Sequence, residues 1–170
     1  MSTNTDDTIT IRPATRDDVP LVLQFIRDLA IYERLEHEVS ASEAELREAL
    51  FGERRYAEVV FACRAGEPVG FALFFHNFST FKGRPGIYLE DLFVRPEARG
   101  RGIGKRLLAY LARTAVERRC ARLEWAVLDW NEPSIGFYRS LGAVPMDEWT
   151  TFRLTDDALA LLAGSAPADG

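Results

Sequence analysis

Apolar side chains recur along this chain with two spacings, which predict strands alternating with helices. Thr8–Arg12 alternates and is rich in β-branched residues, as is typical of a strand. Apolar residues at helical spacing after Asp18 then predict a helix through about residue 36. Ser42-Glu-Ala-Glu45 has the Ser-x-x-Glu form of a capping box and predicts a shorter helix that ends near Leu50.

The middle of the chain favours β-structure. Two strands, Ala57–Arg64 and Pro68–Phe75, are joined by Ala65-Gly66-Glu67, which is a hairpin signal. A loop, Asn77–Pro85, leads into a third strand, Ile87–Val94. These segments predict a sheet whose central strands lie next to one another in the sequence.

The last third of the chain predicts helices and short strands in alternation. Gly102–Arg119 carries an apolar stripe with arginines on the opposite side, which indicates an amphipathic helix. Asn131 is placed to cap a helix, with Pro133 in its first turn and Gly142 just past its end. The remaining expected elements are a strand at Leu123–Leu128, a last strand at Thr150–Leu154 and a helix at Asp156–Leu162.

This order of elements predicts an α/β fold with a mixed sheet and helices on both faces. Residues 8–162 are expected to form a single domain, and residues 1–7 and 163–170 to be flexible tails. A length of 170 residues is within the usual range of one domain.

Charge and cysteine content narrow the functional classes. A net charge of -5 argues against binding nucleic acid or an anionic membrane, because both partners require a basic surface. Two cysteines without metal-ligand spacing argue against a disulfide scaffold and a zinc site. No apolar run reaches the roughly 18 residues of a membrane span, and the polar start of the chain has no signal-peptide pattern. A cytoplasmic protein is expected.

The most informative motif is Arg99-Gly-Arg-Gly102-Ile-Gly104, between an expected strand and an expected helix. Glycines let the backbone approach a ligand closely, and a helix start adds partial positive charge, so the segment suits a phosphate group. The spacing fits neither a P-loop nor a dinucleotide-binding fingerprint. A tight turn with solvated arginines is the alternative that this loop alone leaves open.

These residues resemble the GCN5-related N-acetyltransferase (GNAT) superfamily, whose Arg/Gln-x-x-Gly-x-Gly/Ala hallmark matches Arg99, Gly102 and Gly104. Within this superfamily, residues 8–154 of the chain resemble the diamine (spermidine/spermine) and thialysine N-acetyltransferase branch. Segments that carry this second likeness are Tyr88-Leu-Glu-Asp91, Ala126-Val-Leu-Asp-Trp-Asn131 and Phe137-Tyr138. The resemblance implies a GNAT-type mixed, mostly antiparallel sheet and acetyl-CoA as co-substrate.

The resemblance also implies a cofactor site. The backbone of Leu92, Phe93 and Val94 would pair with the pantetheine arm, and the amides from Arg99 to Lys105 would hold the pyrophosphate. Asn131 matches a cofactor contact and is equally well explained as a helix cap. The full implied set is Leu92, Phe93, Val94, Arg99, Gly100, Arg101, Gly102, Ile103, Gly104, Lys105, Asn131, Pro133 and Ser134.

Two catalytic roles follow from the resemblance. Tyr138 would be the general acid, since a phenol can donate a proton to a departing thiolate. Glu90 would be the base, acting directly or through water. Because successive strand residues face opposite sides, only one of Glu90 and Asp91 is expected to face the cleft.

The implied acceptor is a primary amine on a small molecule, held by Tyr32, Glu33, Glu90, Trp125 and Glu148. Thr80 stands near the position where polyamine enzymes carry an acid, which leaves thialysine-like and other small amines open. A protein lysine or N-terminal acetyltransferase and a non-catalytic acyl-CoA-binding module are the alternatives. A homodimer is expected from the resemblance, with the last strand contributing to the interface.

Overall fold

The structure, a computed structural model, describes residues 8–167. Contacts within the chain divide it after Ala126 into two units, residues 1–126 and 127–170, and each is considered by itself. The tail expected at residues 1–7 and the end of the tail expected at 163–170 lie outside the described residues. That residues 8–162 form a single domain stays a prediction.

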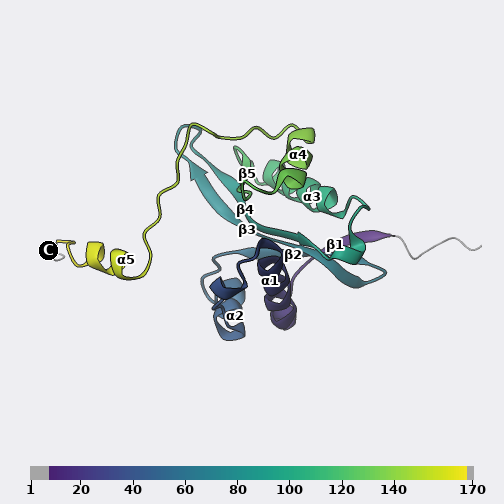
Figure 1. Ribbon diagram of the computed structural model, residues 1–170, viewed down its shortest axis with the longest axis horizontal. Coiled ribbons are helices and arrows are strands. Elements are labelled where there is room, and N and C mark those ends of the chain that lie inside the picture. Colours follow the sequence, from purple (N-terminus) through teal and green to yellow (C-terminus); the bar gives the residue numbers. More distant parts are fainter. Residues whose placement is uncertain (1–7, 168–170) are drawn as a thin grey trace, which may run out of the picture. The chain divides into compact units, whose positions relative to one another are not determined.

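The first unit is built on a five-stranded sheet in the order β1-β2-β3-β4-β5 (Figure 1). Strands β1 to β4 pair antiparallel in sequence order, whereas β5 pairs parallel with β4. The prediction of a mixed, mostly antiparallel sheet is thereby confirmed. Strand bounds are β1 (Ile9–Pro13), β2 (Glu58–Arg64), β3 (Glu67–Ser79), β4 (Arg84–Val94) and β5 (Leu123–Trp125).

Helices cover both faces of this sheet. Helices α1 (Val19–Glu33) and α2 (Glu43–Phe51) lie on one face, and α3 (Ile103–Glu117) lies on the other (Figure 1). The predicted capping box of α2 is present, because the Glu45 amide donates to the Ser42 hydroxyl at 3.2 Å and the Ser42 amide donates to the Glu45 carboxylate at 2.8 Å. Helix α1 ends earlier than expected, since Arg34 adopts a left-handed backbone with φ of 61°.

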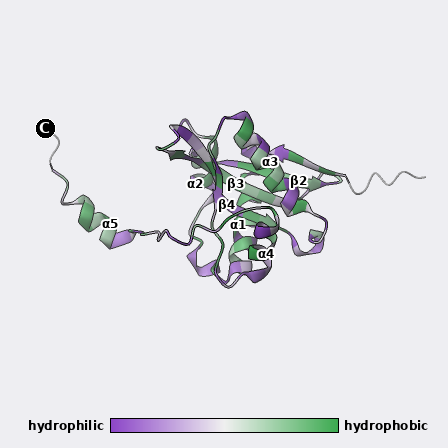
Figure 2. Cartoon of the chain, turned by 90° about the horizontal axis from the view of Figure 1, so that it is seen from above, coloured by the Kyte–Doolittle hydropathy of each residue, from purple (hydrophilic) through white to green (hydrophobic). Residues whose placement is uncertain are grey.

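Aromatic rings fill the space between α1 and the sheet. The Phe25 ring lies 5.2 Å from that of Phe71 and 5.8 Å from that of Phe61, and all three side chains are fully buried. On the opposite face, α3 buries its apolar stripe and leaves its polar side outward, so both colours run along it in Figure 2. The residues of this stripe include Ile103, Leu107, Leu108 and Leu111.

The loop expected at Asn77–Pro85 is largely wrong. Strands β3 and β4 pair out to Ser79 and Arg84, and the turn is confined to Thr80–Gly83, where Gly83 has φ of 61°. This end of the ribbon is more exposed than the sheet centre, so its polar residues resemble those of a loop. Gly86 has no side chain, which lets the Asn77 amide donate to the Glu124 carboxylate at 3.0 Å.

The second unit contains α4 (Glu132–Ser140) and α5 (Asp156–Ala163). Gly142 follows α4 with φ of 87°, which agrees with its predicted place past the helix end. The strand expected at Thr150–Leu154 is wrong, since that segment has no strand structure and Phe152 is 91% exposed. A strand requires a pairing partner, and in the part of the chain that the structure describes no other segment pairs with this one.

No helix in the described part of the chain combines the length and the apolar character needed to cross a membrane.

Candidate active site

Strand β4 contains a β-bulge at Glu90. Leu73 of β3 pairs with Asp91, but the next residue, Phe74, pairs with Leu89. One extra residue is therefore inserted in β4, and the strict alternation of side chains is interrupted between Leu89 and Asp91. The expectation that only one of the two adjacent carboxylates faces a given site depended on unbroken alternation.

Strand β5 accompanies β4 only as far as this bulge. Its last residue, Trp125, pairs with Leu89, so the strand predicted to reach Leu128 ends three residues early. Within the described residues, Asp91–Val94 pairs with β3 on one side and with no strand on the other. Leu92, Phe93 and Val94 thus lie where the predicted pantetheine contact requires an unpaired strand edge.

Three carboxylates, Glu33, Glu90 and Asp91, form an acidic group beside the bulge. Burial, followed by the charges of Glu90 and Glu33, raises the pKa of Asp91 to about 6. Burial also raises the pKa of Glu33, whereas Glu90 is exposed. An ammonium ion placed here would relieve the repulsion among these charges.

Asp91 was not assigned to the site from the sequence. Strand alternation alone suggested that it faces away from Glu90, and the bulge removes that separation. The signal that could have found it is the Glu-Asp pair itself, because two adjacent acids in the middle of a buried strand are unusual without a functional or paired partner.

The glycine loop has the geometry that the sequence led us to expect. Gly100 and Gly102 have φ of 78° and 72°, a left-handed conformation that favours glycine. A Cβ added to Gly100, Gly102 or Gly104 would meet nothing within 4 Å, so the surface above the loop is open. Helix α3 begins at Ile103 with no side-chain cap, as α1 also does, so its first amides can donate to a ligand.

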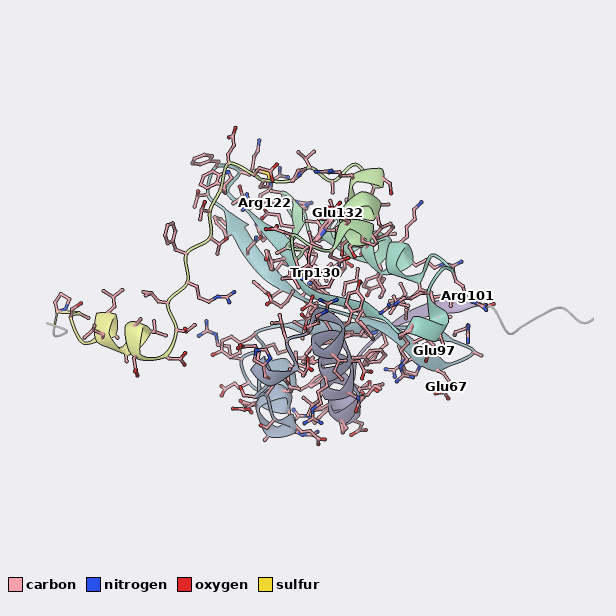
Figure 3. The ribbon with its side chains drawn as sticks, viewed as in Figure 1. Glu67, Glu97, Arg101, Arg122, Trp130 and Glu132 are labelled. Carbon is pink, nitrogen blue, oxygen red and sulfur yellow. The ribbon has the colours of Figure 1, made fainter. Side chains whose placement is uncertain are left out.

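The basic residues around this loop do not all face it. Lys105 is exposed in the first turn of α3, and Arg101 lies on the segment between β4 and α3, close to Glu97 in sequence (Figure 3). Arg95 instead places its guanidinium carbon 4.9 Å from the centroid of Phe25 on the α1 face. Arg106 lines a surface hollow between α3 and β1, together with Tyr110 and Arg113.

Two expected substrate residues border the acidic group. Tyr32 is in the last turn of α1, and its ring lies 6.5 Å from that of Phe93. Trp125 ends β5 opposite Leu89, next to the bulge. The structure therefore brings Tyr32, Glu33, Glu90 and Asp91 together in the first unit.

The other expected residues are in the second unit. Asn131 is buried and accepts a hydrogen bond from the Ser134 amide at 3.4 Å, which confirms its capping role. Its sequence neighbours Trp130 and Glu132 are labelled in Figure 3, and Pro133 is in the first turn of α4. Tyr138 is half-buried in α4 with its ring 5.6 Å from that of Phe137. Glu148 is exposed in the segment between α4 and α5.

Comparison with known proteins identifies the family of the chain. Residues 23–143 match the model of the acetyltransferase (GNAT) family. The chain is 41% identical to the thialysine N-epsilon-acetyltransferase of Bos taurus, with 92% of this chain and 98% of that protein covered. It is 34% identical to the L-ornithine N5-acetyltransferase of Arabidopsis thaliana, with 88% and 85% covered.

The fold is also similar to that of a solved protein from the mobile metagenome of V. cholerae, an integron cassette protein. That comparison has a TM-score of 0.78 and 29% sequence identity, with 92% of this chain and 98% of that chain covered.

Proposed function

The chain belongs to the acetyltransferase (GNAT) family, and we propose that it transfers the acetyl group of acetyl-CoA to the primary amine of a small molecule. Amino acids of the thialysine or ornithine kind are the proposed acceptors, since two relatives carry those names. The acidic group of Glu33, Glu90 and Asp91 carries the proposal, because it offers a cationic amine a site beside the open edge of β4.

The co-substrate would bind along β4 and the glycine loop. Backbone groups of Leu92, Phe93 and Val94 would pair with the amides of the pantetheine arm, as they would with an added strand. The amides of Arg99, Gly100, Arg101, Gly102, Ile103, Gly104 and Lys105 hold the pyrophosphate at the uncapped start of α3. Support for this placement comes from the open space above the three glycines.

Glu90 prepares the amine for attack. An alkylammonium with a pKa of about 10.4 must lose a proton, which costs roughly 4–5 kcal/mol at neutral pH. Glu90 is exposed at the bulge, so it can pass that proton to solvent directly or through a water molecule. Glu33 and Asp91 hold the cation, Tyr32 and Trp125 flank it, and Glu148 is a further candidate contact.

Tyr138 completes the reaction by donating a proton. The amine nitrogen attacks the acetyl carbon, the carbon–sulfur bond breaks, and the departing thiolate takes the phenolic proton of Tyr138. The nitrogen loses its surplus proton as the amide forms, and that proton restores the Tyr138 phenol. Asn131 and Ser134, at the start of the same helix, and Pro133 between them would contact the pantetheine arm. The products are an N-acetylated amine and free coenzyme A, formed by direct transfer within one ternary complex.

A substrate screen tests the proposal. Free coenzyme A is measured with a thiol reagent while acetyl-CoA is offered with thialysine, ornithine, lysine, spermidine and short peptides with free amines. We expect release with one or more of the free amino acids and little with peptides. Turnover of peptides alone would indicate a protein acetyltransferase, and binding of acetyl-CoA without turnover would indicate a non-catalytic module.

We also propose that the protein is a homodimer whose interface includes the segment after α4. Several apolar side chains of this segment are exposed, among them Val144, Met146, Trp149 and Phe152. These apolar side chains would be covered by the same segment of a second copy. Light scattering should give twice the chain mass, and a chain truncated after Gly142 should give the monomer mass.

A further inference from the structure

The side chain of Arg99 is held by two other elements of the first unit. Its guanidinium carbon lies 4.9 Å from the ring centroid of Tyr32 and 5.3 Å from that of Phe93. Its Nε donates a hydrogen bond of 2.9 Å to the Val94 carbonyl. Arg99 therefore joins the last turn of α1 to the end of β4 and to the start of the glycine loop.

This arrangement distinguishes the side chain of Arg99 from its backbone. The guanidinium packs against two aromatic rings and its Nε bonds the carbonyl of Val94, the last residue of β4, so the side chain fixes the position where the loop begins. The backbone that follows, Gly100-Arg101-Gly102, bends twice through left-handed conformations. A segment with such glycines can adopt many backbone conformations when no ligand is bound, and a fixed residue at its first position reduces their number.

We call the contact of the Arg99 guanidinium with the rings of Tyr32 and Phe93 the Arg99 clamp. Tyr32 connects this clamp to the acidic group, where the amine is proposed to bind. Tyr32 precedes Glu33, a member of the acidic group, and the two residues share the last turn of α1. An amine bound by the acidic group would restrict this turn, including the Tyr32 ring. Tyr32 is 38% exposed, so an acceptor can reach part of this residue.

We propose that Arg99 is a positioning residue that couples amine binding to acetyl-CoA binding through Tyr32. Ordering of Tyr32 by the amine orders the Arg99 guanidinium, and thereby the loop that receives the pyrophosphate. Coupling between two sites is reciprocal, so each ligand tightens the binding of the other. The coupling rests on the proposed function. The effect of Tyr32 on the loop can be measured as coenzyme A binding, without any acetyl transfer.

The first experiment uses coenzyme A alone, followed by calorimetry. Tyr32→Ala is expected to weaken its binding about fivefold, although Tyr32 is on α1 and not on the loop. Tyr32→Phe keeps the ring and is expected to bind within about 1.5-fold of the unchanged protein. Arg99→Ala is expected to weaken binding about tenfold, and adding Tyr32→Ala to it should have no further effect, because the shared contact is already gone.

A matched control is available in Tyr56, which is also exposed and has the guanidinium of Arg54 5.0 Å above its ring. Tyr56→Ala removes a similar pair remote from the loop in sequence and should leave coenzyme A binding unchanged. Should Tyr32→Ala fold poorly, Tyr32→Leu retains apolar packing while removing the aromatic face. Unchanged coenzyme A affinity in a folded Tyr32→Ala or Tyr32→Leu variant, or losses that multiply in the double variant, would overturn the clamp.

The second experiment adds thialysine to coenzyme A, a pair that cannot react. Thialysine is expected to tighten coenzyme A binding roughly fivefold in the unchanged protein and not in Arg99→Ala. Equal tightening in both proteins contradicts the coupling. If the unchanged protein binds no coenzyme A at all, the proposed function itself has failed, and that outcome is distinct from failure of the clamp.

Discussion

Leu73 lies opposite Asp91 across β3 and β4, although an unbroken register from the outer part of the hairpin would place Leu73 opposite Glu90. This displacement of one residue has two effects on chemistry. It places Asp91 on the face of the sheet that carries α1, where burial, followed by the charges of Glu90 and Glu33, raises its pKa. It also leaves Glu90 exposed at the point where β5 ends, so the two acids occupy different environments suited to different roles.

Removing the Glu90 carboxylate should slow the reaction most at neutral pH. With Glu90→Gln, kcat/KM for the amine is expected to fall about 100-fold at pH 7 and progressively less toward pH 10. The reason is that solvent deprotonates the amine without help once pH approaches its pKa. Initial rates of coenzyme A release between pH 6.5 and pH 10 measure this, with Glu97→Gln, an exposed glutamate on the segment before α3, as the control. A loss of equal size at every pH would exclude the base role.

Neutralising Asp91 should stabilise the protein in a pH-dependent way. Its folded pKa of about 6 lies above the ordinary value of 3.8, so stability due to its protonated form is present below pH 3.8 and is lost as pH rises through 6. Asp91→Asn is therefore expected to be more stable than the unchanged protein at pH 8 by up to about 3 kcal/mol, and nearly equal at pH 4. Urea unfolding at the two pH values measures the difference. An equal gain in the free energy of unfolding at both pH values would show that the effect comes from packing and not from charge.

A methyl group on the glycine loop should separate stability from binding. Gly104 is in the first turn of α3 and has open space where a Cβ would stand, so Gly104→Ala is expected to leave stability unchanged or raise it by up to about 1 kcal/mol. Acetyl-CoA affinity is expected to fall at least tenfold, because the methyl occupies the place proposed for the pyrophosphate.

Gly66→Ala provides the reverse control for this variant. Gly66 has φ of 84° in the β2–β3 turn and also has open space around it, so its substitution costs about 1 kcal/mol in backbone strain. It should leave the affinity unchanged. Calorimetry and thermal unfolding of both variants measure the two effects, and equal acetyl-CoA affinity in Gly104→Ala and the unchanged protein would remove the loop from the cofactor site.

Loss of the Tyr138 hydroxyl should affect turnover and not binding. Tyr138→Phe is expected to lower kcat about 100-fold while the Kd for acetyl-CoA changes less than twofold, because the phenol acts only as the thiolate departs. Steady-state kinetics and calorimetry measure the two quantities. Tyr110→Phe, on α3, is the matched control and should retain full activity. An unchanged kcat in Tyr138→Phe would assign the proton to another donor.

Local chemistry explains which parts of the fold could be predicted. The Ser42 capping box, the Asn131 cap and the turn at Gly142 each depend on contacts within a few residues, and all three are present. The bulge at Glu90 was not foreseen, because it is defined by the register of β4 against β3 and not by either strand alone. The outer ends of β3 and β4 are exposed and have the polar composition of a loop. Their pairing, like the bulge, is defined by the two strands together and not by either one alone.

Site residues divide in a similar way. Glu90 and the glycine loop stand next to one another along β4 and the segment after it, so a motif could identify them. The Glu-Asp pair marks Asp91 as unusual, but its contact with Glu33 of α1, like that of Arg99 with Tyr32, joins residues far apart in the sequence. No pattern around residue 91 or 99 indicates α1 as the neighbour. A short stretch of sequence does not indicate which distant helix or strand packs against it.

Helix α3 is anchored differently at its two ends. Arg118, just past its last turn, donates two hydrogen bonds of 2.6 and 2.8 Å to Glu58 on β2 and lies over the ring of Phe74. Its other end follows two glycines and has no side-chain cap. Buried Ile103 and Leu107 nevertheless fix the first turns of α3 to the sheet, so both ends of the helix are held. We therefore expect a ligand at the open first turn to meet amides that are already in place, with little movement of α3.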